Sequence, residues 1–145
     1  MNAIIPEVVG YEGTGYDKSE YEEQQVIKST ITLYSSLVKA LFDMGATHSF
    51  IAVKIIQKLG ITPQKLDIAL NAASPLGATV KLGHMCKDCP LHLEDQSLLA
   101  NLIVLSIKEF NVIQGVDCLT KYHAKINYVR KRISFSVLGG QSFDF

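Results

Sequence analysis

Short apolar runs separated by turn-forming residues recur along this 145-residue chain, a pattern typical of β-strands. The first predicted strand begins near Val26 and ends at Tyr34, and a turn at Ser35-Ser36 leads into a second strand over 37–42. Further strands are predicted at 66–70, 79–85, 91–93 and 98–105, with a last pair within 126–137. These runs predict a mostly β protein.

One stretch has the spacing of a helix instead. Ile51, Ile55, Ile56 and Leu59 recur at helical intervals, which predicts a short helix that turns this stripe toward the core. Ser49 stands where an N-cap would, and Gly60 supplies the stop. A second short helix is predicted at 119–124, so the fold class is mostly β with one or two short helices.

Composition separates one domain from two linkers. Residues 1–27 are rich in acidic residues and glycine, with few aliphatic residues after Val9, and they are expected to form a flexible acidic linker. Residues 28–137 are predicted to form the domain, and 138–145, beginning near Gly139-Gly140, a C-terminal linker. The chain is 48% hydrophobic and 19% charged, which is typical of a single globular domain.

The charge balance argues against electrostatic binding. Lys plus Arg and Asp plus Glu are equal at 14 each, so no net field attracts nucleic acid or an acidic membrane. The Arg130-Lys131-Arg132 cluster is interpreted as the solvated side of a strand or turn. Because the sequence also shows neither a signal peptide nor an apolar run of about 20 residues, we expect an intracellular, cytoplasmic protein that is not secreted.

Three cysteines without a secretory signal predict reduced thiols. Cys86 and Cys89 form a single CxxC pair, and a zinc site would need a second pair of ligands. His84 and His92 lie nearby, but their spacing fits no zinc pattern. We therefore expect no metal and no cofactor, with a redox or zinc module as the alternative.

An aspartate ends one of the apolar runs, in the stretch ALFDMGATHSF. A carboxylate at the end of a buried strand is costly unless its oxygens accept hydrogen bonds or share a proton. Gly45 permits a tight turn whose N–H groups could point at Asp43, and the small Ala46 allows another chain segment to come close. An aspartic peptidase needs this arrangement at its catalytic loop; the alternative for Asp43 is an Asx turn. His48 is expected to have a structural or capping role.

Two blocks carry a resemblance to a known family. FDMGATHSFI (42–51) and NVIQGVDCL (111–119) resemble the retropepsin-like protease of gypsy-type LTR retrotransposon Gag-Pol polyproteins, whose plant members read close to FDSGATHSFI and DVILGMDWL. The resemblance extends from about 30 to 135. It implies a retropepsin-like closed β-barrel, equivalent to half of a pepsin-like bilobal fold. In this fold the second block, an apolar strand ending at Gly115 and a helix start at Val116-Asp117, would pack beside the catalytic loop.

The resemblance also assigns roles to residues. Asp43 would be catalytic, and the catalytic loop would continue through Met44, Gly45 and Ala46. The flap over the substrate would comprise Ser74, Pro75, Leu76, Gly77 and Ala78. Because the chain has one such aspartate, the second must come from another copy, which implies a C2 homodimer. The expected function is an aspartic endopeptidase that cleaves its own polyprotein and favours mildly acidic pH.

Three residues depart from the family pattern. Met44 stands where the family has Ser or Thr, and the lost hydroxyl would have bonded across the dimer axis. Gln114 replaces an aliphatic residue and Cys118 a tryptophan, which leaves a polar group to satisfy and a space to fill. The alternative function is therefore a catalytically weakened or inactive dimerisation or peptide-binding module.

Overall fold

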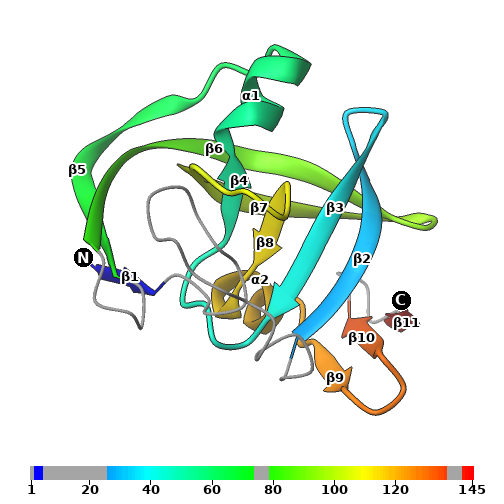
Figure 1. Cartoon of the computed structure of the whole chain (residues 1–145). Coiled ribbons are helices and arrows are strands. Elements are labelled where there is room, and N and C mark those ends of the chain that lie inside the picture. The colour runs from blue at the N-terminus through cyan, green and yellow to red at the C-terminus, as the bar shows by residue number, and fades with distance from the viewer. Residues whose placement is uncertain (1, 5–25, 74–78, 137–141) are drawn as a thin grey trace.

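A computed structural model describes residues 2–4, 26–73, 79–136 and 142–145, so the predicted flap residues 74–78 lie outside the described residues (Figure 1). Among the described residues, two short helices accompany eleven strands. The strands are β1 (Asn2–Ile4), β2 (Val26–Leu33), β3 (Ser36–Asp43), β4 (Phe50–Ala52), β5 (Gln64–Ala73), β6 (Thr79–Leu93), β7 (Gln96–Leu105), β8 (Val112–Gln114), β9 (Lys125–Asn127), β10 (Arg132–Ser136) and β11 (Ser142–Asp144). The helices are α1 (Val53–Leu59) and α2 (Val116–Lys121).

The strands form one large sheet and one small one. The large sheet has the order β1-β5-β6-β2-β3-β8-β4-β7, and β6 pairs with β7 as well. The pairings therefore lead from β6 through β2, β3, β8 and β4 to β7, and from β7 back to β6. The small sheet, β11-β10-β9, lies beside the lower end of β2 (Figure 1). The predicted class, mostly β with one or two short helices, is confirmed.

A tight hairpin produces the strand that ends in Asp43. Tyr34 and Ser35 have φ values of 47° and 67°, the two left-handed residues of a type I′ turn, so the turn lies one residue earlier than predicted. β2 and β3 then pair without interruption from Leu33 opposite Ser36 to Val26 opposite Asp43. The unbroken register fixes the position of Asp43 relative to the first strand of the domain.

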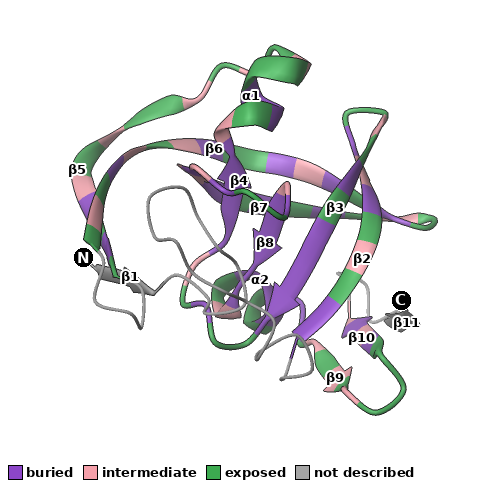
Figure 2. Cartoon of the chain, in the orientation of Figure 1, coloured by how far each residue is buried: buried purple, intermediate pink, exposed green. Residues whose placement is uncertain are grey.

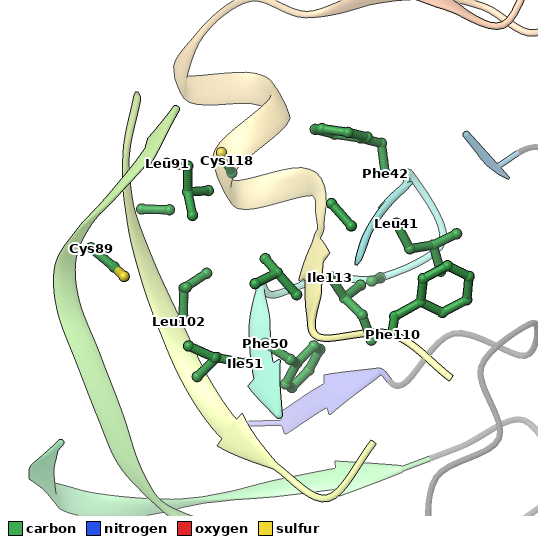
Figure 3. Packing of buried hydrophobic residues seen from close by; sticks show 14 of the residues in the cluster. Leu41, Phe42, Phe50, Ile51, Cys89, Leu91, Leu102, Phe110, Ile113 and Cys118 are labelled. Atoms are coloured by element: carbon green, nitrogen blue, oxygen red, sulfur yellow. The ribbon is translucent and has the colours of Figure 1, made fainter. Parts of the chain in front are cut away.

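The region predicted as separate strands at 79–85 and 91–93 is one long strand, β6. The strand accommodates the CxxC sequence as a β-bulge, because its register against β7 shifts between Cys86 and Cys89. Asp88 has a φ of 51°, and its N–H donates to Oδ1 of Asn101 at 2.9 Å. A bulge consumes one extra residue, so both cysteines face the interior; Figure 3 shows Cys89 beside Leu102 of β7.

The first helix starts later than the sequence predicted. Residues 50–52 form β4, which pairs with β7 and β8, so α1 begins at Val53 and Ser49 is not its N-cap. The predicted stop is confirmed: Gly60 has a φ of 66°, and its N–H donates to the carbonyl of Ile56. The second helix starts at Val116, three residues before the helix predicted at 119–124, and this is where the second block placed a helix start.

The core surrounds the strands that lead to and from Asp43. In Figure 2 the lower part of β3 and all of β4 and β8 are buried, whereas β5 is mostly exposed. Phe42 lies 6.2 Å from Phe135 and 6.0 Å from Phe145 between ring centroids. Phe135 of β10 and Phe145, which follows β11, therefore pack against the residue that precedes Asp43.

The predicted domain limits fall close to these elements. β2 begins at Val26, and β1 and β11 lie in the segments predicted as linkers. The limits of 28 and 137 stay a prediction. Across the described residues, neither helix is long and apolar enough to cross a lipid bilayer.

All three cysteines are free and buried, which agrees with the prediction of reduced thiols. Burial raises the pKa of Cys118 to about 12, with the charge of Asp117 adding to the effect. Burial likewise raises the pKa of Cys89 to about 11. These thiols are protonated and unreactive near neutral pH.

The raised pKa of Cys118 predicts a loss of stability in alkali. Below the ordinary thiol pKa of 9.0 the group is protonated in both states, so its contribution is fully present. As the pH rises toward about 12, the unfolded thiol ionises first, and the free energy of unfolding should fall by about 1.4 kcal/mol per pH unit. Urea denaturation measures the free energy of unfolding at about pH 8 and about pH 10.5. The decrease between these two pH values should be smaller for Cys118→Ala than for the parent chain. An equal loss in both proteins would contradict this assignment.

Candidate active site

The carboxylate of Asp43 is fixed by the turn that follows it. Asp43 is the last residue of β3 and only 7% exposed. The N–H of Gly45 donates to Oδ1 of Asp43 at 2.7 Å, and the N–H of Ala46 donates to the Asp43 carbonyl at 3.2 Å. The bond to Oδ1 is that of an Asx turn, the alternative for Asp43, and it also supplies the N–H predicted for a catalytic loop. The turn therefore orients the carboxylate in either case.

The residues after Asp43 differ in what they can tolerate. A Cβ added to Gly45 would lie 3.0 Å from Oδ1 of Asp43, so a side chain there would crowd the carboxylate. Met44 is 44% exposed, and its side chain adds little to the core. Ala46 is fully buried. The loop is thus tightly constrained at Gly45 and Ala46 but open to solvent at Met44.

The loop after Asp43 crosses directly over the second sequence block. β8 lies between β3 and β4, so residues 44–49 must pass over its end to connect these two strands. A Cβ on Gly115 would lie 2.2 Å from the carbonyl oxygen of His48 and 2.6 Å from that of Ala46. The N–H of Val116 donates to the same Ala46 carbonyl at 2.8 Å. The predicted packing of the two blocks against each other is therefore observed at Gly115.

Ser49 joins the loop to α2. Its side chain is 1% exposed, and its hydroxyl donates to Oδ1 of Asp117 at 2.7 Å. The same hydroxyl accepts the N–H of Gly115 at 3.0 Å, while Oδ1 of Asp117 also accepts the N–H of Cys118 at 2.8 Å. A residue predicted to cap α1 thus ties the loop to the other helix. One signal for this link was present in the sequence: Ser49 and Asp117 belong to the two blocks that were expected to pack against each other.

Tyr128 lies close enough to Asp43 to be affected by its charge, which the sequence did not indicate. It follows β9, is half-buried and packs against the core cluster. Burial raises the pKa of Tyr128, and the charge of Asp43 raises it further. A neutral phenol therefore lies within the electrostatic reach of Asp43. No motif contained Tyr128, and only the folding of the β9–β10 hairpin brings it to this end of the sheet.

Gln114 is a buried amide beside the loop. It is 1% exposed and occupies the β8 position opposite Phe42 in the register. Neither Oε1 nor Nε2 of Gln114 has a hydrogen-bond partner within the described part of the chain. A buried amide was expected to have partners, and none is found among these residues. Its burial therefore carries a free-energy cost.

The remaining predicted residues have simpler roles. His48 contributes its carbonyl to the crossing at Gly115, and its Nδ1 lies 2.8 Å from Oγ1 of Thr47. The flap residues, Ser74 to Ala78, lie outside the described residues, so their role stays a prediction. Within the described ranges, His, Cys, Asp and Glu side chains form no group of three or more that could hold a metal.

The crossing predicts that Gly115→Ala severely destabilises the fold. The added methyl group would overlap the His48 carbonyl, and displacing that backbone should lower the free energy of unfolding by about 3 kcal/mol or more. Gly83→Ala is the matched control, because a Cβ there meets no atom of the described residues within 4 Å. Urea denaturation compares the two variants. Similar stabilities for both would show that the loop can move away from Gly115.

The unsatisfied amide predicts that Gln114→Leu stabilises the protein. Leucine restores an apolar side chain of similar size and removes two buried polar atoms, which should raise the free energy of unfolding by about 1–3 kcal/mol. Gln114→Glu, which places a carboxyl at the same point, should lower it. Thermal and urea unfolding measure both changes. A loss of stability in Gln114→Leu would mean that the amide has a partner in the assembled protein.

The chain resembles known proteins both in its fold and in its sequence. The chain superposes on the "retroviral protease-like domain of Ddi1 from Leishmania major" with a TM-score of 0.62 and 15% identity, covering 82% of this chain and 94% of that one. At this identity the likeness shows the retropepsin-like fold alone. A search of curated proteins found no match. The sequence matches the family described as "Retroviral aspartyl protease" over residues 14–141, and the chain therefore belongs to the retroviral aspartyl protease family.

Proposed function

We propose that the protein is an aspartic endopeptidase that works as a homodimer on peptide bonds of its own polyprotein. The observation that carries the proposal is the carboxylate of Asp43, buried at the end of β3 and oriented by the Gly45 N–H at 2.7 Å. Membership of the retroviral aspartyl protease family supports peptidase chemistry at a coarse level. Asp43 would be the catalytic residue, with Met44, Gly45 and Ala46 as its loop.

The proposed mechanism needs two carboxylates. Asp43 of one subunit and the partner's Asp43 would face each other across the dimer axis and share one proton. The ionised carboxylate takes a proton from water as the water attacks the scissile carbonyl, and the protonated carboxyl polarises that carbonyl. The bond from Gly45 N–H fixes Oδ1 before substrate binds, which limits the reorganisation needed during the reaction. This chemistry requires no metal or cofactor.

The proposed biological setting is a gypsy-type LTR retrotransposon polyprotein of plant type. FDMGATHSFI and NVIQGVDCL support it, because they resemble the corresponding blocks of such Gag-Pol proteins. In this setting 28–137 would be the protease domain between two linkers, and Ser74 to Ala78 would cover the substrate. The substrate would bind as an extended strand. We place the reaction in the cytoplasm.

A second function is favoured by one feature, the absence of a hydroxyl at position 44. Met44 is 44% exposed and cannot make the bond that Ser or Thr would make across the axis. Each missing hydrogen bond costs on the order of 1 kcal/mol, and a dimer would lose two. The buried amide of Gln114 further weakens the same region. The second candidate is therefore a dimerisation or peptide-binding module with little or no catalysis.

Cleavage of a mixed peptide library at about pH 5 tests the first function. The parent chain should cut peptides, whereas Asp43→Asn should reduce the rate by at least about a thousandfold, because the dyad can no longer hold an ionised and a protonated carboxyl. Asp67→Asn is a matched control on an exposed strand position. Cleavage that survives in Asp43→Asn would overturn the assignment of Asp43.

Met44→Ser separates the two functions in the same assay. A sharp rise in turnover would show that the parent fold is poised for catalysis and lacks only the hydroxyl. Absence of cleavage in both proteins, from folded dimeric samples, would favour the binding module. Circular dichroism and sedimentation establish that each sample is folded and dimeric.

A further inference from the structure

The outer edge of β5 is occupied by a strand from a distant part of the sequence. β5 pairs with β6 along one edge, and on the other edge it pairs with β1 in parallel. Asn2, Ala3 and Ile4 lie opposite Asn71, Ala72 and Ala73, in that order. β1 lies within the segment that the sequence predicted to be a linker. Its pairing is therefore a tertiary contact and needs an explanation beyond local folding.

The occupied part of this edge suits an uncharged extended peptide. Neither Asn71–Ala73 nor Asn2–Ile4 contains a charged residue. On β5, Ala72 is fully buried, and Ala73 on the next position is small, so a second backbone can come close. Pairing at a sheet edge is made by main-chain groups, which every peptide carries. Another aliphatic strand could thus replace Asn2–Ile4 without loss of main-chain hydrogen bonds.

The location of this edge links it to the proposed peptide site. Ala73 is the last residue of β5 and directly precedes the proposed flap residues, 74–78. In Figure 1, β1 lies at the end of the β5–β6 hairpin, toward the same side of the molecule as the end of β3. β3 ends at Asp43. An extended peptide that approached this side and paired with β5 would meet β1 already in place.

We propose that Asn2–Ile4 is an internal competitor that occupies the edge of β5 at Asn71–Ala73 and must leave before an extended peptide can pair there. The inference rests on the proposed function for the statement that this peptide is a substrate. A strand tethered in the same chain competes at a high effective concentration, so it can hold an edge that a free peptide binds weakly. If β1 is paired 90% of the time, the apparent affinity for an external peptide is reduced about tenfold.

The test uses the full chain with substitutions in β1 alone. Ala3→Pro combined with Ile4→Pro removes two backbone donors and disfavours the strand without touching β5. Ala3→Val combined with Ile4→Val is the matched control, because it keeps both donors and the strand preference. Ala3→Gly combined with Ile4→Gly weakens the strand while keeping its donors, and it should give a smaller change in the same direction.

Two measurements read out the competition independently of catalysis. Hydrogen exchange should become faster in the proline variant at those amides of Asn71–Ala73 that face β1 rather than β6, and should stay unchanged in the valine control. A labelled peptide with the sequence of residues 1–8, MNAIIPEV, should bind the proline variant about tenfold more tightly than the parent chain in a fluorescence anisotropy assay. Unchanged exchange, or faster exchange with unchanged peptide affinity, would overturn the proposal.

Kinetics distinguish the failure of this inference from the failure of the proposed function. If the protein cleaves peptides, the proline variant should show a KM about tenfold lower with kcat unchanged. Cleavage with the same KM in all variants would overturn the competitor and leave the protease assignment intact. Absence of cleavage in every variant, with tighter peptide binding by the proline variant, would overturn the protease assignment and support the competitor.

Discussion

The close crossing of two backbones at Gly115 is the constraint on which the site depends. The carbonyls of Ala46 and His48 occupy the space where any other residue would place its Cβ, at 2.6 Å and 2.2 Å. Because β8 separates β3 from β4, the loop cannot avoid this crossing. The Ala46 carbonyl accepts the N–H of Val116 and the Ser49 hydroxyl accepts the N–H of Gly115, and these bonds hold the loop against the end of β8. The β2–β3 register places Asp43 at the end of its strand, and the crossing fixes the course of the loop that follows it.

The site combines rigid and weak elements. Gly45 N–H and the Ser49–Asp117 bond fix the loop at both of its ends, with donor to acceptor distances of 2.7 Å. Between them, Met44 faces solvent, and beneath the loop the amide of Gln114 is buried without a partner among the described residues. The loop is therefore fixed at both ends by contacts within its own chain and is open to solvent at Met44. Both proposed functions, the enzyme and the binding module, are compatible with a loop of this kind.

Local patterns predicted those features that depend on neighbouring residues. The mostly β class, the turn at Gly45 and the helix stop at Gly60 each follow from short-range geometry. The prediction for Ser49 was wrong because its hydroxyl serves Asp117, which lies 68 residues away in the chain. The position of Tyr128 near Asp43 and the pairing of β1 with β5 also depend on tertiary contacts, for which a single sequence holds no periodic signal.

The return of β7 to β6 has a consequence for self-association. Strands that are paired on both sides offer no unpaired backbone to another molecule, and the circuit from β6 to β7 leaves few such edges among the described residues. One of these edges is the outer edge of β5, which is paired only at Asn71–Ala73 among the described residues. The rest of that strand carries exposed Lys65 and Asp67 beside Ile68, which is 79% exposed. Burying these charged side chains against another strand would cost free energy, so they protect this open edge against the stacking of strands into aggregates.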